Sequence, residues 1–234
     1  MKPKSKLMTD QEFRKEFVVT ADGSPTFRIP GLNETYHSVH GARTESEHVF
    51  IRNGLEHYFL LHRPSSLTVG EAGFGTGLNA LLTGLWAAHR QIPVLYDTYE
   101  KYPLSPKLIE IYGRALEPEE QDLFARLHAA PWEKPIKISP YFHIIKRQRD
   151  FREIDRKNFW HVFYHDAFSP RVQPHLWETS LFRLIRRGMI KDGVWVTYSA
   201  KGSVRRNLIE AGFKVEKLPG PPGKREMLRA INVI

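Results

Sequence analysis

The stretch from residue 69 to residue 79 has the residue types of a ligand-binding turn. Its sequence is Val69-Gly70-Glu71-Ala72-Gly73-Phe74-Gly75-Thr76-Gly77-Leu78-Asn79. A β-prone run leads into an acidic residue, three glycines follow at alternate positions, and a segment with helical periodicity comes next. Because glycine has no Cβ, such a turn can bend sharply and let a ligand approach the backbone.

The spacing of the glycines distinguishes two kinds of nucleotide site. A dinucleotide fingerprint has the form G-x-G-x-x-G. It would need a glycine at position 78, which is Leu78. The form E-x-G-x-G-x-G is instead typical of turns that hold the amino-acid part of S-adenosylmethionine (SAM), although a glycine-rich turn can also form without a ligand. The candidate cofactor-binding residues here are Glu71, Gly73, Phe74, Gly75, Thr76, Gly77 and Asn79.

Three more acids follow predicted strands. Glu100 ends the second strand, next to Lys101; Asp150 follows the third strand and Asp166 ends the fourth. Ligands of open α/β sheets bind outside the carboxyl ends of the strands, so we expect all three acids near the glycine turn. Glu100 would bind ribose hydroxyls there, and Asp150 would meet the adenine amino group. Each acid taken singly could instead be a helix cap.

The segment Asp166-Ala167-Phe168-Ser169-Pro170 is the predicted reacting edge. It resembles the acid/amide–Pro–aromatic segments that amino-group methyltransferases carry after their fourth strand. Methyl transfer to nitrogen needs a neutral amine at about 3–3.5 Å from the methyl group. Since alkyl amines are mostly protonated at neutral pH, a carboxylate that takes the proton is useful. We therefore expect Asp166, with Phe168 and Pro170, to be catalytic; the alternative for Asp166 is a structural N-cap.

The elements that must position these residues alternate between strand and helix from about residue 65. Strands are predicted at 67–71, 94–100, 141–146, 160–165 and 194–199. Helices are predicted at 78–89, 106–114, 119–128, 176–187 and 204–211. A C-terminal strand pair follows at 214–217 and 226–231. Alternating strands and helices predict an α/β fold with a doubly wound, mostly parallel sheet.

The N-terminal part differs from the rest. Residues 17–20 and 25–29 flank an Asp-Gly turn and predict a hairpin, and a polar, His-rich stretch follows at 36–40. We expect an N-terminal extension at 1–64 and one catalytic domain at 65–234. His37 and His40 have H-x-x-H spacing without a third ligand in a fixed frame, so no metal site is expected.

Charge points to a polyanionic partner. The 234 residues include 35 basic and 26 acidic side chains, a formal net charge of +9. Nucleic acid is the first expectation, with a solvated surface on a basic enzyme as the alternative. Basic residues cluster at 146–149, at 183–187, at 205–206 and at 224–225. We expect Arg206 and Lys224 to be exposed and to contribute to phosphate binding.

Other classes are excluded by composition. The sequence has no cysteine, which excludes disulfides, Cys-ligated zinc, iron–sulfur clusters and the thiolate that pyrimidine C5-methyltransferases use. No signal peptide and no apolar run of membrane-spanning length is present, so a cytoplasmic protein is expected, with no membrane partner.

The whole pattern resembles the tRNA 5-methylaminomethyl(-2-thio)uridine methyltransferase family, the methyltransferase half (MnmC methyltransferase-domain or MnmD type) of a bifunctional wobble-uridine enzyme. The matching segments are 33–38, 45–51, 71–79, 99–104, 166–170 with Pro174 and Trp177, 205–213 and 223–227. The resemblance implies a class I SAM-dependent methyltransferase fold (Rossmann-like) with a small N-terminal β extension. It also implies methylation of 5-aminomethyluridine, or its 2-thio form, in the anticodon region of tRNA.

Two features qualify the resemblance. The bifunctional relatives also carry a FAD-dependent oxidase that removes a carboxymethyl group, and this chain has no residues left for one. We therefore expect a stand-alone form that accepts only the aminomethyl intermediate. Many relatives have glycine where Ala167 stands here. A small-molecule or protein amine methyltransferase, and a non-catalytic RNA-binding protein with a vestigial SAM pocket, remain alternatives.

Overall fold

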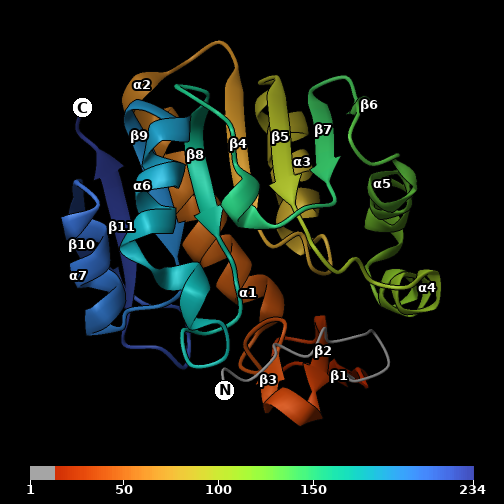
Figure 1. Cartoon of the computed structure of the whole chain (residues 1–234). Helices are drawn as coiled ribbons and strands as arrows, with labels where there is room; N and C mark the ends of the chain where they lie inside the picture. The colour runs from red at the N-terminus through yellow and green to blue at the C-terminus, as the bar shows by residue number, and fades with distance from the viewer. Residues whose placement is uncertain (1–13) are drawn as a thin grey trace.

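The computed structural model describes residues 14–234, in which an eight-stranded sheet lies between two layers of helices (Figure 1). The strand order is β10-β11-β9-β8-β4-β5-β7-β6. The strands are β4 (Leu67–Ala72), β5 (Val94–Tyr99), β6 (Pro135–Ser139), β7 (Phe142–Arg147), β8 (Trp160–His165), β9 (Met189–Thr197), β10 (Phe213–Pro219) and β11 (Glu226–Asn232). The five central strands are parallel, and the last two form the antiparallel pair that the sequence predicts.

The central strands are apolar because both faces of the sheet are covered. In each of β4, β5 and β8, all residues but one are buried, as expected for parallel strands between helices. The chain runs from β4 to β5 on one side and returns to β8 on the other side of β4. Such a reversal of strand order opens a crevice at the carboxyl ends of the strands.

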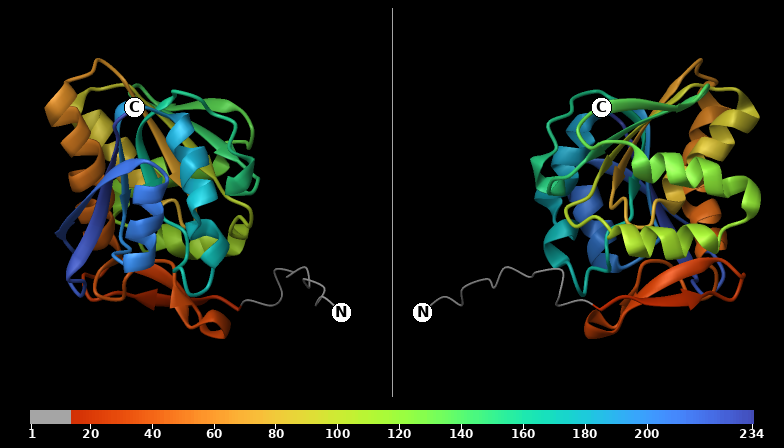
Figure 2. Two further views of the ribbon diagram at one scale, coloured as in Figure 1. Left: turned by 60° about the vertical axis from the view of Figure 1, so that its left-hand side comes forward. Right: turned by 90° about the vertical axis from the view of Figure 1, so that its right-hand side faces the viewer.

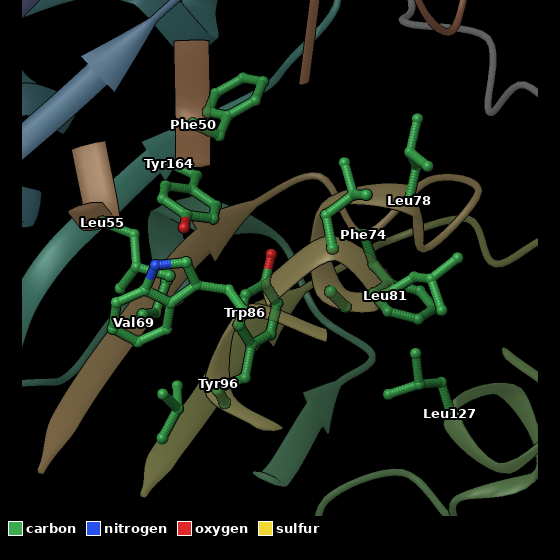
Figure 3. Close-up of a cluster of buried hydrophobic side chains, with 14 of the residues drawn as sticks. Phe50, Leu55, Val69, Phe74, Leu78, Leu81, Trp86, Tyr96, Leu127 and Tyr164 are labelled. Atoms are coloured by element: carbon green, nitrogen blue, oxygen red, sulfur yellow. The ribbon is translucent and has the colours of Figure 1, made fainter. Parts of the chain in front are cut away.

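Helices cover both faces of the sheet and bury two hydrophobic clusters. The helices that follow β4 are α3 (Leu78–Arg90), α4 (Pro106–Arg114), α5 (Pro118–Ala129), α6 (Thr179–Gly188) and α7 (Gly202–Glu210). One cluster joins α3 and α5 to the sheet, and Figure 3 shows part of it, including Val69, Leu81 and Leu127. The other cluster joins α6 and α7 to the opposite face. None of the helices within residues 14–234 has the length and apolar character needed to cross a membrane.

Residues 42–62 form a helical layer that the sequence analysis missed. They contain α1 (Ala42–Ser46), the π-helix η3 (Glu47–Glu56) and α2 (His57–His62). The π-helix packs against β8, β9 and α3. Gly54 is its point of closest approach, since a Cβ there would lie 2.9 Å from Val196 Cγ2. The wider turn of a π-helix does not follow the usual 3.6-residue period, which explains why the pattern was overlooked.

The predicted N-terminal hairpin is confirmed. Strand β1 (Glu16–Val19) pairs antiparallel with β2 (Pro25–Ile29), and β3 (Glu34–Thr35) adds a third strand. Figures 1 and 2 show this small sheet below the carboxyl ends of the parallel strands. The extension therefore closes the edge of the central sheet at which a ligand is expected.

Two predicted boundaries were wrong. The helix expected at 176–187 is interrupted: a 3-10 helix, η5 (Pro174–Trp177), precedes α6. The fifth parallel strand begins at Met189 rather than at Val194, with a register shift against β8. Strand β6 was not predicted, because it lies at the edge of the sheet and only one of its residues is buried.

A glycine in β4 provides a test of this packing. A Cβ at Gly70 would lie 2.5 Å from Phe163 Cδ2 and 2.8 Å from Trp160 Cδ2, and both rings are fully buried. We expect Gly70→Ala to lower the free energy of unfolding by about 1–3 kcal/mol through overpacking. Urea denaturation measures this. Gly202→Ala is the matched control, because its Cβ would meet only the side chain of Arg206, at 3.4 Å; equal stability of the two variants would contradict this account.

Candidate active site

Two adjoining cavities lie at the carboxyl ends of the parallel strands. The first, of about 390 Å³, is lined by the glycine turn, by the Asp166–Ser169 segment and by residues of the N-terminal part. The second, of about 280 Å³, is lined by Asp150 and Lys101 among others. The residues shared by both linings are Tyr36, Glu100, Tyr102, Phe151, Phe168 and Gln173. Together the cavities form one crevice that extends from Asp166 to Asp150.

The glycine turn has the backbone geometry that its sequence predicts. Gly73, Gly75 and Gly77 all have positive φ, at 99°, 51° and 81°. A Cβ at Gly73 would lie 2.7 Å from the carbonyl oxygen of Asp166. Glycine is therefore needed there so that the turn can approach the reacting edge. Gly73 and Gly75 line the first cavity, and Phe74, Thr76 and Asn79 line it as well.

Glu100 stabilises the glycine turn through a hydrogen bond. Its Oε2 accepts the backbone N–H of Gly75 at 3.0 Å, and its Oε1 accepts that of Tyr102 at 2.8 Å. Burial raises the pKa of this carboxyl. Each oxygen keeps a lone pair for another donor. This arrangement is compatible with the predicted bonds to two ribose hydroxyls.

Asp150 has more protein partners than the sequence suggested. Arg152 donates three hydrogen bonds to it, from the backbone N–H, Nε and a terminal nitrogen, and Lys101 Nζ donates a fourth at 3.1 Å. These bonds, those of Arg152 first, lower the pKa of Asp150. Its side chain caps the 3-10 helix η4 (Phe151–Glu153). The cap considered as an alternative is therefore present, and contact of this carboxylate with adenine stays a prediction.

Asp166 and Glu71 are joined by Asn79. The Asn79 Nδ2 donates to Asp166 Oδ2 at 2.8 Å and to Glu71 Oε1 at 3.1 Å, while Thr98 donates to Glu71 Oε2 at 2.7 Å. Burial, followed by the charges of Glu71 and Glu45, raises the pKa of Asp166 well above its usual value. Burial likewise raises the pKa of Glu71 to about 7. Glu71 is buried and does not belong to the cavity lining, whereas Asp166 lines the cavity.

The rest of the reacting edge is irregular. Asp166 leads into a loop, and η5 begins only at Pro174, with Gln173 in the N-cap position. The N-cap alternative for Asp166 is therefore wrong. The Phe168 ring lies in the crevice, 5.2 Å from that of Tyr36. Pro170 and Gly77 lie outside the linings of the two cavities described here, so their proposed contacts with ligands stay predictions.

Three residues that the sequence analysis did not place in the site line the same cavity: Glu45, Tyr198 and Lys224. The Tyr198 hydroxyl donates to the carbonyl of Ala167 at 2.9 Å. Lys224 forms a salt bridge with Glu45, and its Nζ lies 4.0 Å from the centre of the Tyr198 ring. Their segments are distant in the sequence, and the only earlier signal was that 45–51 and 223–227 belong to the segments that resemble the family.

His37 links the N-terminal extension to the glycine turn. Its Nδ1 lies 3.2 Å from Thr26 Oγ1, and its Nε2 lies 3.4 Å from Thr76 Oγ1. Burial lowers the pKa of His37 to about 4, so the ring is neutral at physiological pH. These hydroxyl partners make His37 a structural connection between β2 and the turn.

Part of the expected basic surface is internal. Lys146 is buried, and its Nζ donates to the carbonyl of His128 at 2.8 Å. Arg147 pairs with Asp97, Arg149 pairs with Glu133, and the salt bridge of Lys224 places it in the cavity. Lys224 is therefore half-buried rather than exposed as expected, and its contact with a phosphate stays a prediction. Lys201, Arg206 and Arg225 are exposed.

The strand order, the glycine turn and the acids at the strand ends define the class I fold of SAM-dependent methyltransferases. A family described as S-adenosyl-L-methionine-dependent methyltransferase matches residues 143–233. MNMC2 from Aquifex aeolicus has a similar crystal structure, with 28% identity, a TM-score of 0.76, and coverage of 95% of this chain and 72% of that chain. Spermidine synthase from Thermotoga maritima, 15% identical with a TM-score of 0.57, covers 97% of this chain and 71% of that one and shares the fold.

Relatives with assigned names show which methyltransferases the chain resembles. The tRNA 5-methylaminomethyl-2-thiouridine biosynthesis bifunctional protein MnmC of Burkholderia vietnamiensis is 33% identical over 87% of this chain and 33% of its own length. The protein of the same name from Azoarcus sp. is 32% identical over 89% of this chain and 34% of its own length. The chain thus spans about a third of these relatives. These matches confirm the predicted resemblance, the fold class and SAM as the cofactor of such a domain.

The residues of the crevice fit SAM. Gly75 leaves space at the cavity wall, because a Cβ there would meet only the Tyr36 ring, at 3.2 Å. The Oδ1 of Asn79 is buried without a hydrogen-bond partner among residues 14–234 and is available to a donor from a ligand. The carboxylates of Glu100, Asp166 and Glu71 suit a cofactor with a cationic sulfur and an ammonium group.

The raised pKa of Glu71 predicts a pH-dependent stability. The folded protein holds this proton more tightly than the unfolded chain, in which the pKa is near 4.5. The stabilisation is therefore complete below about pH 4.5 and is lost as the pH rises through about 7. Glutamine does not titrate. The quantity to compare is the free energy of unfolding of the wild type minus that of Glu71→Gln, both measured without SAM. This difference should fall as the pH rises from about 4.5 to about 7.

Urea denaturation at a series of pH values measures the difference. Glu110→Gln, which changes an exposed carboxylate on α4, is the control and should give a difference that varies little with pH. A constant difference for Glu71→Gln would show that the proton is not held more tightly in the folded state.

Proposed function

We propose that the protein methylates the aminomethyl group of 5-aminomethyl(-2-thio)uridine at the tRNA wobble position, giving 5-methylaminomethyl(-2-thio)uridine, with SAM as methyl donor. The proposal rests mainly on the half-buried carboxylate of Asp166, which lines the same cavity as the glycine turn. The names of the relatives supply the substrate, and the net charge of +9 supports a nucleic-acid partner. The domain architecture proposed is an extension, 1–64, that closes the catalytic domain, 65–234.

The proposed cofactor contacts follow the crevice. Gly73, Gly75 and Thr76 would hold the amino-acid part, Glu100 the ribose, and the wall near Asp150 and Lys101 the adenine. Their neighbours in the motif, Glu71, Phe74, Gly77 and Asn79, would support the turn. When bound, SAM supplies a methyl group on a cationic sulfur, which the amine lone pair takes as a neutral thioether leaves.

Asp166 would release that lone pair by taking a proton from the substrate ammonium. A carboxyl with a raised pKa accepts a proton readily once it is ionised. The positive charges of the ammonium and of the bound cofactor favour ionisation of Asp166, since each lies in the same poorly solvated cavity. Phe168 and Tyr36 would exclude water and contact the base.

The wobble nucleotide suits this site because it lies in a single-stranded loop. Specific recognition of RNA usually targets such loops, whose bases can be turned outward and packed on aromatic side chains. Phe168, Tyr36 and Tyr198 all line the first cavity. Exposed cations around the crevice would bind the phosphates on either side.

Asp166→Asn tests the chemistry. Asparagine keeps the size of the side chain and an oxygen that can accept the bond from Asn79, but it cannot take the proton. We expect turnover of aminomethyl-tRNA to fall by about 10²–10⁴. Affinity for SAM, measured by calorimetry, should change little by comparison. Asp122→Asn, at an exposed position on α5, is the control; near-normal turnover in Asp166→Asn would remove this residue from the mechanism.

Salt dependence tests the tRNA interface. Arg225 is exposed and adjoins Lys224 of the cavity wall, so we expect it to contact a phosphate. Arg225→Ala should then weaken tRNA binding modestly and reduce the slope of log K against log salt by about one. Lys191→Ala is the matched control, because Lys191 is exposed near the start of β9, at the opposite end of this parallel strand from the crevice. Equal slopes for Arg225→Ala and the wild type would place the interface elsewhere.

A further inference from the structure

A carboxylate, an aromatic ring and a lysine from three distant segments meet on the wall of the first cavity. Glu45 belongs to α1, Tyr198 follows β9, and Lys224 lies in the loop before β11. All three line the cavity that also contains Asp166. The Glu45 residue is only 5% exposed, so its charge is held in a poorly solvated position.

The carboxylate and the ring are each positioned by bonds that do not involve the lysine. The backbone N–H of Ser38 donates to Glu45 Oε2 at 2.8 Å. The Tyr198 hydroxyl donates to the carbonyl of Ala167 at 2.9 Å, next to Asp166. Glu45 Oε1 is the oxygen that receives Lys224. Removal of the ammonium would therefore leave an acceptor and a ring already in place.

The ammonium of Lys224 shows what this wall binds. It forms an ion pair with Glu45 and lies 4.0 Å from the centre of the Tyr198 ring. A carboxylate combined with an aromatic face is the arrangement by which proteins bind alkylammonium groups. The aminomethyl group of the proposed substrate is itself a primary alkylammonium at neutral pH. Lysine and substrate thus present the same –CH₂–NH₃⁺ group.

We propose that Glu45 and Tyr198 form the ammonium subsite of the substrate, and that Lys224 occupies this subsite until the aminomethyl group displaces it. The inference rests on the proposed function and extends it to the recognition of the substrate amine. Exchange of one ammonium for another keeps Glu45 paired, so no buried carboxylate is left without a cation. The displaced lysine becomes available to an RNA phosphate, and a base that lacks the amine does not displace it.

Glu45→Gln tests the subsite. Glutamine retains an oxygen for the Ser38 N–H but removes the charge. The KM for aminomethyl-tRNA should rise roughly 10- to 100-fold, the loss expected for a charge-assisted hydrogen bond, with a smaller change in kcat. The affinity for tRNA with plain uridine at the wobble position should stay within about twofold of the wild type, because that base has no ammonium. Glu47→Gln is the matched control, since Glu47 is only two residues away but lines a different cavity.

Lys224→Met tests the exchange. Methionine keeps the length of the side chain and removes the competing charge, so the KM for aminomethyl-tRNA should fall severalfold. In the double variant with Glu45→Gln this gain should disappear, because both changes act on one ion pair. Thermal unfolding of each variant verifies that it is folded, and Lys224→Gln replaces Lys224→Met if the latter is not.

Two outcomes overturn the inference while the proposed function stands: an unchanged KM in Glu45→Gln, or equal loss of affinity for aminomethyl-tRNA and plain tRNA. The second would mean that Glu45 and Lys224 form a purely structural ion pair. Wild-type protein that does not methylate aminomethyl-tRNA would instead contradict the proposed function itself.

Discussion

The site depends on the close placement of two carboxyl groups at the ends of adjacent strands, the buried Glu71 and the half-buried Asp166. Strands β4 and β8 are paired so that Ala72 lies opposite His165, and Asp166 N–H donates to the carbonyl of Ala72 at 3.0 Å. Two negative charges at this depth would repel each other strongly. A bridging amide from Asn79 and the raised pKa values of both acids relieve the repulsion. A cationic ligand in the crevice would relieve it further.

Segments from the N-terminal and C-terminal parts of the chain complete this site. The N-terminal part contributes Tyr36 and Glu45, and the loop before the last strand contributes Lys224. Ser169 and Arg171 also bond to Glu34 of β3, so the reacting edge is held against the extension. These contacts enclose the half-buried Asp166 on two sides, and a carboxylate that lines a cavity can act as the base that removes a proton from an amine.

The parts that the sequence predicts well are those specified locally. The glycine turn and the acids at the ends of β4, β5 and β8 follow from strand periodicity and from the rule for open sheets. The subsite formed by Glu45 and Lys224 could not be predicted, because their contact joins segments with no local signal. Charge counting was misleading for a related reason: Lys146 has a basic side chain but is buried, with its pKa lowered to about 8.

The basic composition of the chain and the acidic lining of the crevice are compatible, because the two kinds of charge lie in different parts of the molecule. The chain carries a net charge of +9, yet the walls of the first cavity include the carboxylates of Glu45, Glu100 and Asp166, and Glu71 is hydrogen-bonded to Asn79 of the same wall. A positive exterior attracts a polyanion over a long range without selecting a sequence. A negative interior binds cations at short range, where the dielectric is low. A polynucleotide that carries one alkylammonium group satisfies both fields at once, and unmodified RNA satisfies only the first.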